Sequence, residues 1–274
     1  MPLSLDAWWI MLRQMSRSWL DDYALSMGAA LAYYTLFSLA PLLLIVIAVA
    51  GLVFGEDAAR GEISAQLRSL MGEGGAQAVQ GLLASVHKPA EGVAATVLGA
   101  VLLFVGATTV FSELQDALDR IWRAPTPSRP GGWFSLVRAR LLSFGMILAI
   151  GFLLTVSLVV SATLALMGRW LEPVFGGWLA VASAASAIGG FVLVAVTFAL
   201  IYKVMPRVRV QWKDVWIGAL FTAVLFTLGK SLIGVYLGRS GVVSGFGAAG
   251  SLVVVLLWVY YSAQIFLIGA EFTW

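Results

Sequence analysis

The side chains best suited to chemistry share helical faces within or beside long apolar stretches. Two faces carry most of them: Glu113, Asp116 and Arg120 on the first, and Tyr260, Gln264 and Glu271 on the second. Residues spaced three, four or seven apart lie on one side of a helix, so each set can present its polar groups together. Such groups can bind a polar substrate, or they can be structural, with each carboxylate paired to an arginine or an amide. We expect Glu113 and Glu271 to belong to one polar cluster.

A lone lysine and a proline-containing segment add to these two faces. Lys230 follows Asp214 by 16 residues, about 24 Å along a helix, which predicts a position in the outer third of a membrane span. An ammonium group at that depth can meet an anionic headgroup from inside a helix bundle, or it can snorkel to the nearer surface. Tyr34 and Ser38 precede Pro41, where the missing backbone N–H predicts a kink.

Composition excludes several kinds of site. The 274 residues include no cysteine and one histidine, His87, so thiolate and multi-histidine metal sites cannot form. A metal-dependent nuclease needs carboxylates and histidines around its ions, which disfavours that activity here. Residues 245–250 match a dinucleotide-binding pattern by letter, but they open an apolar helix rather than follow a strand. We therefore expect no cofactor, no nucleic-acid partner and no enzymatic activity.

The overall composition is that of an integral membrane protein. Hydrophobic residues make up 61% of the chain and charged residues 11%, against about 45–50% and about 25% in soluble domains. The mean hydropathy is +0.95. A soluble globule of this size would lack the polar residues to cover its own surface.

Six segments are long and apolar enough to cross about 30 Å of hydrocarbon as helices. They cover residues 27–54, 93–111, 141–167, 179–204, 215–237 and 246–272. The predicted fold is therefore all-α, a polytopic membrane protein whose residues 1–274 form a single six-helix domain.

Lysines and arginines in the connecting segments predict the orientation. Eleven of them fall on the side of the two chain ends and five on the other side. Because cytoplasmic loops carry the excess of positive charge, both termini are expected in the cytoplasm of a bacterial inner-membrane protein.

Three connecting segments have their own predicted structure. Residues 1–22 predict an amphipathic helix on the cytoplasmic surface. Asp21 or Asp22, at its end, is expected to cap the first membrane span. Residues 55–92 predict an external hairpin of two amphipathic helices separated by Gly74 and Gly75, folded against the outer leaflet or over the bundle. Residues 112–140 form a cytoplasmic connection that begins as a helix and ends in a proline-rich stretch.

Three stretches resemble the YihY/BrkB family of bacterial inner-membrane proteins, which carries the label virulence factor BrkB. They are Ala32 to Leu43 with its aromatic pair and Pro-Leu-Leu, Ser112 to Trp122 with its closing Ile-Trp, and Trp212 to the end, including Leu256-Leu257-Trp258-Val259-Tyr260 and Leu267-Ile268-Gly269-Ala270-Glu271. The resemblance implies six membrane helices. It also implies a link with virulence or with the transport of lipid A precursors. The family was earlier labelled a ribonuclease, an activity that the residues of this chain do not support.

The sequence is compatible with two hypotheses about function. The first is a transporter or flippase-like protein for an anionic lipid or envelope precursor, supported by the polar groups inside the apolar stretches. The second is a non-transporting scaffold or envelope-integrity protein, supported by the small residues Ala182, Ser186 and Gly190 on one helical face. Membrane lipids are the expected partners, and a homo-oligomer is compatible with either reading.

Overall fold

The computed structural model describes residues 5–86, 93–125, 140–153, 178–239 and 250–274, together with 137, 155, 156 and 163. Every regular element in these ranges is an α-helix. The helices are α1 (Leu5–Asp21), α2 (Ala24–Phe54), α3 (Glu56–Val86), α4 (Val93–Ile121), α6 (Trp178–Val204), α7 (Trp212–Arg239) and α9 (Gly250–Thr273). Residues 140–153 contribute one further apolar helix, Arg140–Leu153.

Four helices in the described part are long and apolar enough to cross a membrane: Ala24–Leu52, Ser183–Val204, Trp212–Ile233 and Leu252–Thr273. Large apolar side chains are exposed on each of them, among them Phe37, Ile188, Leu232 and Leu252. Soluble monomers rarely expose apolar surface so continuously. The chain is therefore an all-helical integral membrane protein.

These four helices match the first, fourth, fifth and sixth predicted spans. The second predicted span lies in α4, which is helical from Val93 and continues past Phe111 to Ile121. Much of the third, residues 141–167, lies outside the described residues. The count of six spans therefore stays a prediction.

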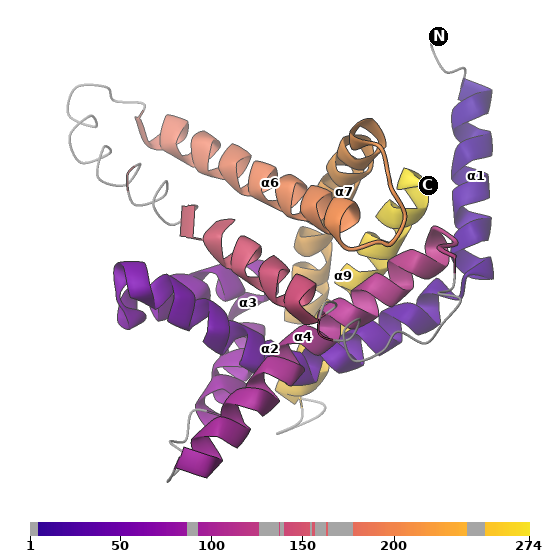
Figure 1. Cartoon of the computed structure of the whole chain (residues 1–274). Helices are drawn as coiled ribbons and strands as arrows, with labels where there is room; N and C mark the ends of the chain where they lie inside the picture. The colour runs from indigo at the N-terminus through magenta and orange to yellow at the C-terminus, as the bar shows by residue number, and fades with distance from the viewer. Residues whose placement is uncertain are drawn as a thin grey trace.

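Helix α9 is the centre of the bundle. It packs against α1, α2, α3, α4 and α7, whereas α6 packs along α7. Figure 1 shows α6 extending away from the other labelled helices toward its N-terminus. One hydrophobic core joins α9 with its neighbours, and its fully buried members include Leu118, Tyr202 and Leu267.

Helices α7 and α9 are antiparallel and cross through a reciprocal glycine–threonine contact. A Cβ atom on Gly218 of α7 would overlap Thr273 of α9, and one on Gly269 of α9 would overlap Thr222 of α7. Each threonine hydroxyl donates to the carbonyl of the glycine four residues earlier on its own helix, at 2.7 Å in both cases. Small residues four apart allow membrane helices to approach closely, and these hydroxyls are satisfied within each helix.

Helix α3 differs from the expected pair of helices. It is one helical element that includes Gly74 and Gly75, yet Gln80 donates to the Ser64 hydroxyl at 3.0 Å. In a straight helix, 16 residues span about 24 Å, so α3 turns back on itself between these two side chains. Its apolar side is buried in the same core as α2 and α9, so α3 lies over the bundle.

The start of α2 also differs from expectation. Its N-cap residue is Tyr23, which has a φ of 57° and makes no side-chain cap hydrogen bond. Neither Asp21 nor Asp22 caps the helix, because the left-handed turn at Tyr23 moves the cap position beyond them. At the other end, Gly55 takes a φ of 86°, which favours glycine, and its N–H donates to the Gly51 carbonyl.

Candidate functional site

The contact between α2 and α9 holds two of the predicted polar residues. Gly28 of α2 lies against Tyr260 and Gln264 of α9. The amide nitrogen of Gln264 donates to the carbonyl of Ala24 at 3.3 Å. The amide oxygen of Gln264 is buried and accepts no hydrogen bond within the described residues. The Gln264 amide oxygen is therefore an unsatisfied hydrogen-bond acceptor between the two helices.

The other predicted residues of α2 lie further along its length. Ser38 is only 2% exposed, and Tyr34 is half-buried and packs edge-on against Tyr33. The helix continues through Pro41. The ring of Pro41 lies beside Gly106 of α4, where a Cβ atom would come within 3.1 Å of it. These residues pack α2 against its neighbours.

Glu271 lies near the end of α9 and is 7% exposed. The charged groups that act on its carboxyl are Asp22 and Arg123, and one of its oxygens has no hydrogen-bond partner among the described residues. The indole N–H of Trp122 donates to the Ala270 carbonyl at 3.0 Å, which fastens the end of α4 to α9 beside this carboxylate.

Glu113 has different surroundings from Glu271. It lies on α4 beyond the predicted span, and burial raises the pKa of its carboxyl, with a smaller contribution from Asp116 one turn further along. Arg123, which acts on Glu271, is ten residues away in the chain, or about 15 Å along a helix. The structure therefore gives the two carboxylates separate neighbours rather than one shared set.

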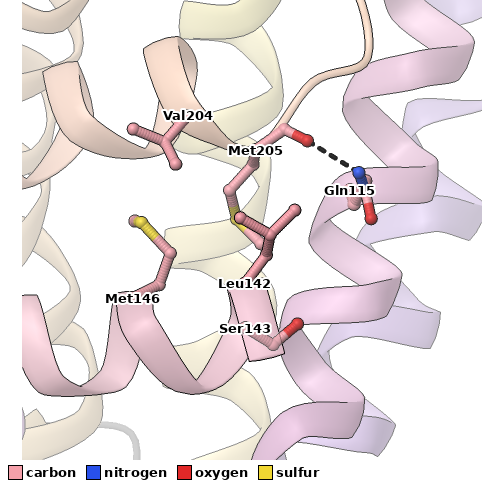
Figure 2. A pocket seen from close by; sticks show the side chains of 6 residues that line it. All are labelled: Gln115, Leu142, Ser143, Met146, Val204 and Met205. Carbon is pink, nitrogen blue, oxygen red and sulfur yellow. Dashed lines mark hydrogen bonds between the residues drawn. The ribbon is translucent and has the colours of Figure 1, made fainter. Parts of the chain in front are cut away.

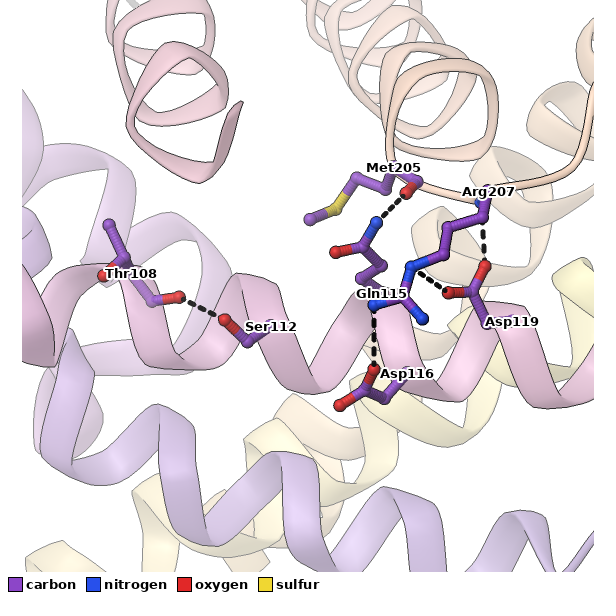
Figure 3. A network of polar contacts seen from close by, with 7 residues as sticks. All are labelled: Thr108, Ser112, Gln115, Asp116, Asp119, Met205 and Arg207. Atoms are coloured by element: carbon purple, nitrogen blue, oxygen red, sulfur yellow. Dashed lines mark hydrogen bonds and ion pairs between the residues drawn. The ribbon is translucent and has the colours of Figure 1, made fainter. Parts of the chain in front are cut away.

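A polar network joins α4 to the connection between α6 and α7 (Figure 3). Asp119 accepts the backbone N–H of Arg207 at 2.8 Å, and its other oxygen lies 3.3 Å from Nε of the same arginine. The side chain of Gln115 donates to the Met205 carbonyl at 2.8 Å. Asp116 lies 4.0 Å from the guanidinium and is largely exposed.

Electrostatics distinguish the two aspartates of this network. The Asp119 side chain is 10% exposed and the Asp116 side chain 66%. Burial raises the pKa of the Asp119 carboxyl, although the N–H and guanidinium of Arg207 act in the opposite direction. A largely buried carboxylate held by one backbone hydrogen bond and one ion pair fixes the position of the connection.

Lys230 lies on a bundle-facing side of α7. It follows Ala223 by seven residues and Ala219 by eleven, so the three share a helical face, and both alanines are fully buried. Lys230 itself is half-buried. Among the described residues it forms no ion pair or hydrogen bond with a protein group.

Along α7, Lys230 lies three residues before the end of the candidate span Trp212–Ile233, the position that the count from Asp214 predicts. Its neighbour Gly229 lies against Tyr261 and Ile265 of α9.

The remaining predicted residues, Asp116 and Arg120, are exposed on α4. The structure thus brings together Tyr260 and Gln264 at Gly28, whereas Ser38, Glu271 and Lys230 lie in separate surroundings. Sequence reasoning did not assign Asp22, Asp119 or Arg207 to the site. The only sequence signal for Asp119 and Arg207 is that each is a charged residue beside an apolar helix.

A small cavity lies where α4 meets the ends of Arg140–Leu153 and α6 (Figure 2). It has a volume of about 10 Å³ and is lined by Gln115, Leu142, Ser143, Met146, Val204 and Met205. A single water molecule needs about 10–15 Å³ of such space. This cavity is therefore too small for an organic substrate.

Comparison with known proteins finds one matching family and several similar membrane proteins. The family model described as virulence factor BrkB matches residues 15–274. The chain is 30% identical over 260 residues to a UPF0761 membrane protein of Pseudomonas paraeruginosa, covering 94% of this chain and 60% of that protein. A UPF0761 membrane protein of Psychrobacter is 28% identical over 285 residues, covering 100% and 49%.

A third relative, the UPF0761 membrane protein of Stenotrophomonas maltophilia, is 30% identical over 257 residues, covering 92% of this chain and 57% of that protein. The chain thus spans about half to three fifths of the length of these relatives. No solved structure matches the chain.

Proposed function

Since the chain belongs to the virulence factor BrkB family of membrane proteins, we propose that it moves an anionic lipid or lipid-linked envelope precursor across a bacterial inner membrane. In this proposal the chain spans the membrane six times with both ends in the cytoplasm. Its action is transport rather than catalysis.

The observation that carries the proposal is Lys230. A cation within a membrane span costs several kcal/mol unless it is paired or hydrated. Lys230 shares a helical face with buried alanines, next to the contact of Gly229 with α9, and has no anionic partner within the described part of the chain. An anionic headgroup passing along α7 would supply the missing charge.

The rest of the bundle supports the same proposal. The Gln264 amide oxygen and one Glu271 oxygen are buried without donors among the described residues. Gln264 lies at the contact of α9 with α2, and Glu271 lies closer to the end of α9. Hydroxyl donors of an anionic headgroup match these acceptors.

The test is translocation of fluorescent lipids in liposomes that contain the purified protein. Phosphatidylglycerol labelled on an acyl chain is the anionic probe, and phosphatidylcholine with the same label is the zwitterionic one. We expect the anionic probe to become accessible to an external quencher faster in protein-containing vesicles. Equal accessibility with and without folded protein would contradict transport.

A scaffold is the second candidate, and one observation favours it. Residues 186–190 of α6, which include Ser186 and Gly190, are all exposed, so this small-residue face is free to hold another helix. A scaffold made of two copies predicts that Ser186→Cys, at an exposed residue of this face, forms a disulfide-linked dimer in membranes, together with no lipid translocation.

A further inference from the structure

A groove lies between α1 and the end of α9. It has a volume of about 240 Å³ and is lined by Met15, Ser16, Trp19, Leu20 and Ile268. Four of these five side chains are apolar or aromatic. The groove is thus shaped and lined for a hydrocarbon segment rather than for a polar solute.

One lining residue offers an unused hydrogen-bond donor. The indole N–H of Trp19 is buried and has no acceptor within the described residues. A buried donor without an acceptor is destabilising, so an occupant that brings an oxygen atom would be favoured. The phosphate and ester oxygens of a phospholipid lie at the boundary where interfacial tryptophans are found.

The rim of the groove is positively charged. Arg13 precedes Ser16 by three residues and Arg17 precedes Leu20 by three, so each arginine neighbours a lining residue on the surface of α1. Both arginines are exposed, and neither forms an ion pair among the described residues. Two free guanidinium groups beside an apolar groove complement an anionic phospholipid.

We propose that this groove binds an anionic phospholipid of the leaflet on the side of the two chain ends. Part of an acyl chain fills the space between α1 and Ile268, an ester oxygen accepts from the Trp19 N–H, and the phosphate accepts from the two arginines. This groove is separate from the proposed site at Lys230, because it is formed by α1 and α9, whereas Lys230 lies on α7. The inference does not depend on transport.

The test is native mass spectrometry of the purified full chain titrated with phosphatidylglycerol or phosphatidylcholine. The double variant Arg13→Gln/Arg17→Gln removes both rim charges. The matched control is Arg209→Gln/Lys213→Gln, which removes two exposed charges away from the groove. Trp19→Phe removes the N–H while keeping an aromatic ring.

We expect the rim variant to weaken phosphatidylglycerol binding at least tenfold, since each basic residue near an anionic surface contributes a factor of about five. Phosphatidylcholine binding and the control should change less than twofold, and Trp19→Phe should weaken both lipids. Unchanged phosphatidylglycerol binding in the rim variant would overturn the proposal. An equal loss in the control would also overturn it, because the effect would then be one of net charge.

Occupancy of the groove itself is tested by blocking it. The chain has no cysteine, so Met15→Cys provides a single thiol in the groove for a bulky maleimide. A folded, labelled protein that has lost its preference for phosphatidylglycerol supports the site. A labelled protein that keeps this preference places the lipid elsewhere and overturns it.

Discussion

Gly218 and Gly269 show how single residues set the approach of two membrane helices. Each leaves room for a threonine of the opposite helix, and a methyl group on either glycine would occupy that room. The sequence shows that these positions are glycines. It does not show which threonine each glycine faces, because that depends on the antiparallel register of α7 and α9.

The first prediction concerns this contact. Gly269→Ala should lower the free energy of unfolding by about 1–3 kcal/mol, because overpacking forces neighbouring side chains to move and the new Cβ atom would lie 2.6 Å from the Tyr202 hydroxyl. Gly189→Ala on α6 is the control, since open space surrounds that position. Thermal unfolding in detergent measures both. A loss of stability of the same size in the control would contradict the packing argument.

A second residue-scale prediction concerns Glu113, whose pKa is raised by burial and by Asp116. The folded state then holds a proton over a pH range where the unfolded state has lost it, so stability falls as pH rises through that range. Glu113→Gln should therefore be more stable than the wild type at about pH 8, with the difference vanishing near pH 4.

The measurement for Glu113 is thermal unfolding across that pH range, with Asp57→Asn on α3 as the exposed control. The control should follow the wild-type curve at each pH. A wild type that gains stability relative to Glu113→Gln as pH rises would reverse the sign and refute the prediction.

At the scale of elements, the sequence predicts much of the helix content, because long apolar runs leave few alternatives to a helix in a membrane. The extension of α4 past Phe111 was also predictable, since its apolar stripe continues through Leu114 and Leu118. The turn within α3 was expected to break the helix at Gly74 and Gly75, but these residues lie inside one element. The apolar side of that element packs against α2 and α9, and these contacts are not visible in its own sequence.

The element-scale prediction concerns the connection between α6 and α7. Asp119→Ala removes two contacts of Arg207 and should destabilise the connection by about 1 kcal/mol, because the exposed backbone N–H of Arg207 loses a hydrogen bond to a charged acceptor and binds water instead. Hydrogen exchange of residues 205–211 should speed up accordingly. Asp116→Ala is the matched control, since its exposed pair at 4.0 Å contributes little. Equal exchange in the two variants would show that Asp119 does not hold the connection.

At the scale of the whole molecule, membrane insertion follows from composition, whereas the relative placement of polar residues does not. Glu113 and Glu271 were expected in one cluster, and the structure gives them separate neighbours. The sequence places each carboxylate near the end of a predicted span, but which span ends meet is set by packing over more than 100 residues of chain separation.

The orientation is tested with single cysteines in this cysteine-free chain. Ala65→Cys on α3 should react with a membrane-impermeant thiol reagent added to intact cells, since that residue is exposed and lies in the predicted external segment. Arg209→Cys, between α6 and α7, should react only after the membrane is opened. Labelling of Arg209→Cys in sealed cells would contradict cytoplasmic chain ends.

The central claim is that Lys230 meets an anionic lipid inside the bundle, and the most direct measurement is lipid translocation by its variants in liposomes. Lys230→Met keeps length and apolar packing but removes the charge, so it should slow phosphatidylglycerol translocation by about tenfold or more, given that one lost ionic contact is worth more than about 1.4 kcal/mol. Lys230→Arg should stay within about threefold of the wild type, because it retains the charge. Lys213→Met at the exposed start of α7 serves as the control and should translocate normally. Wild-type translocation by a folded Lys230→Met protein would contradict the account.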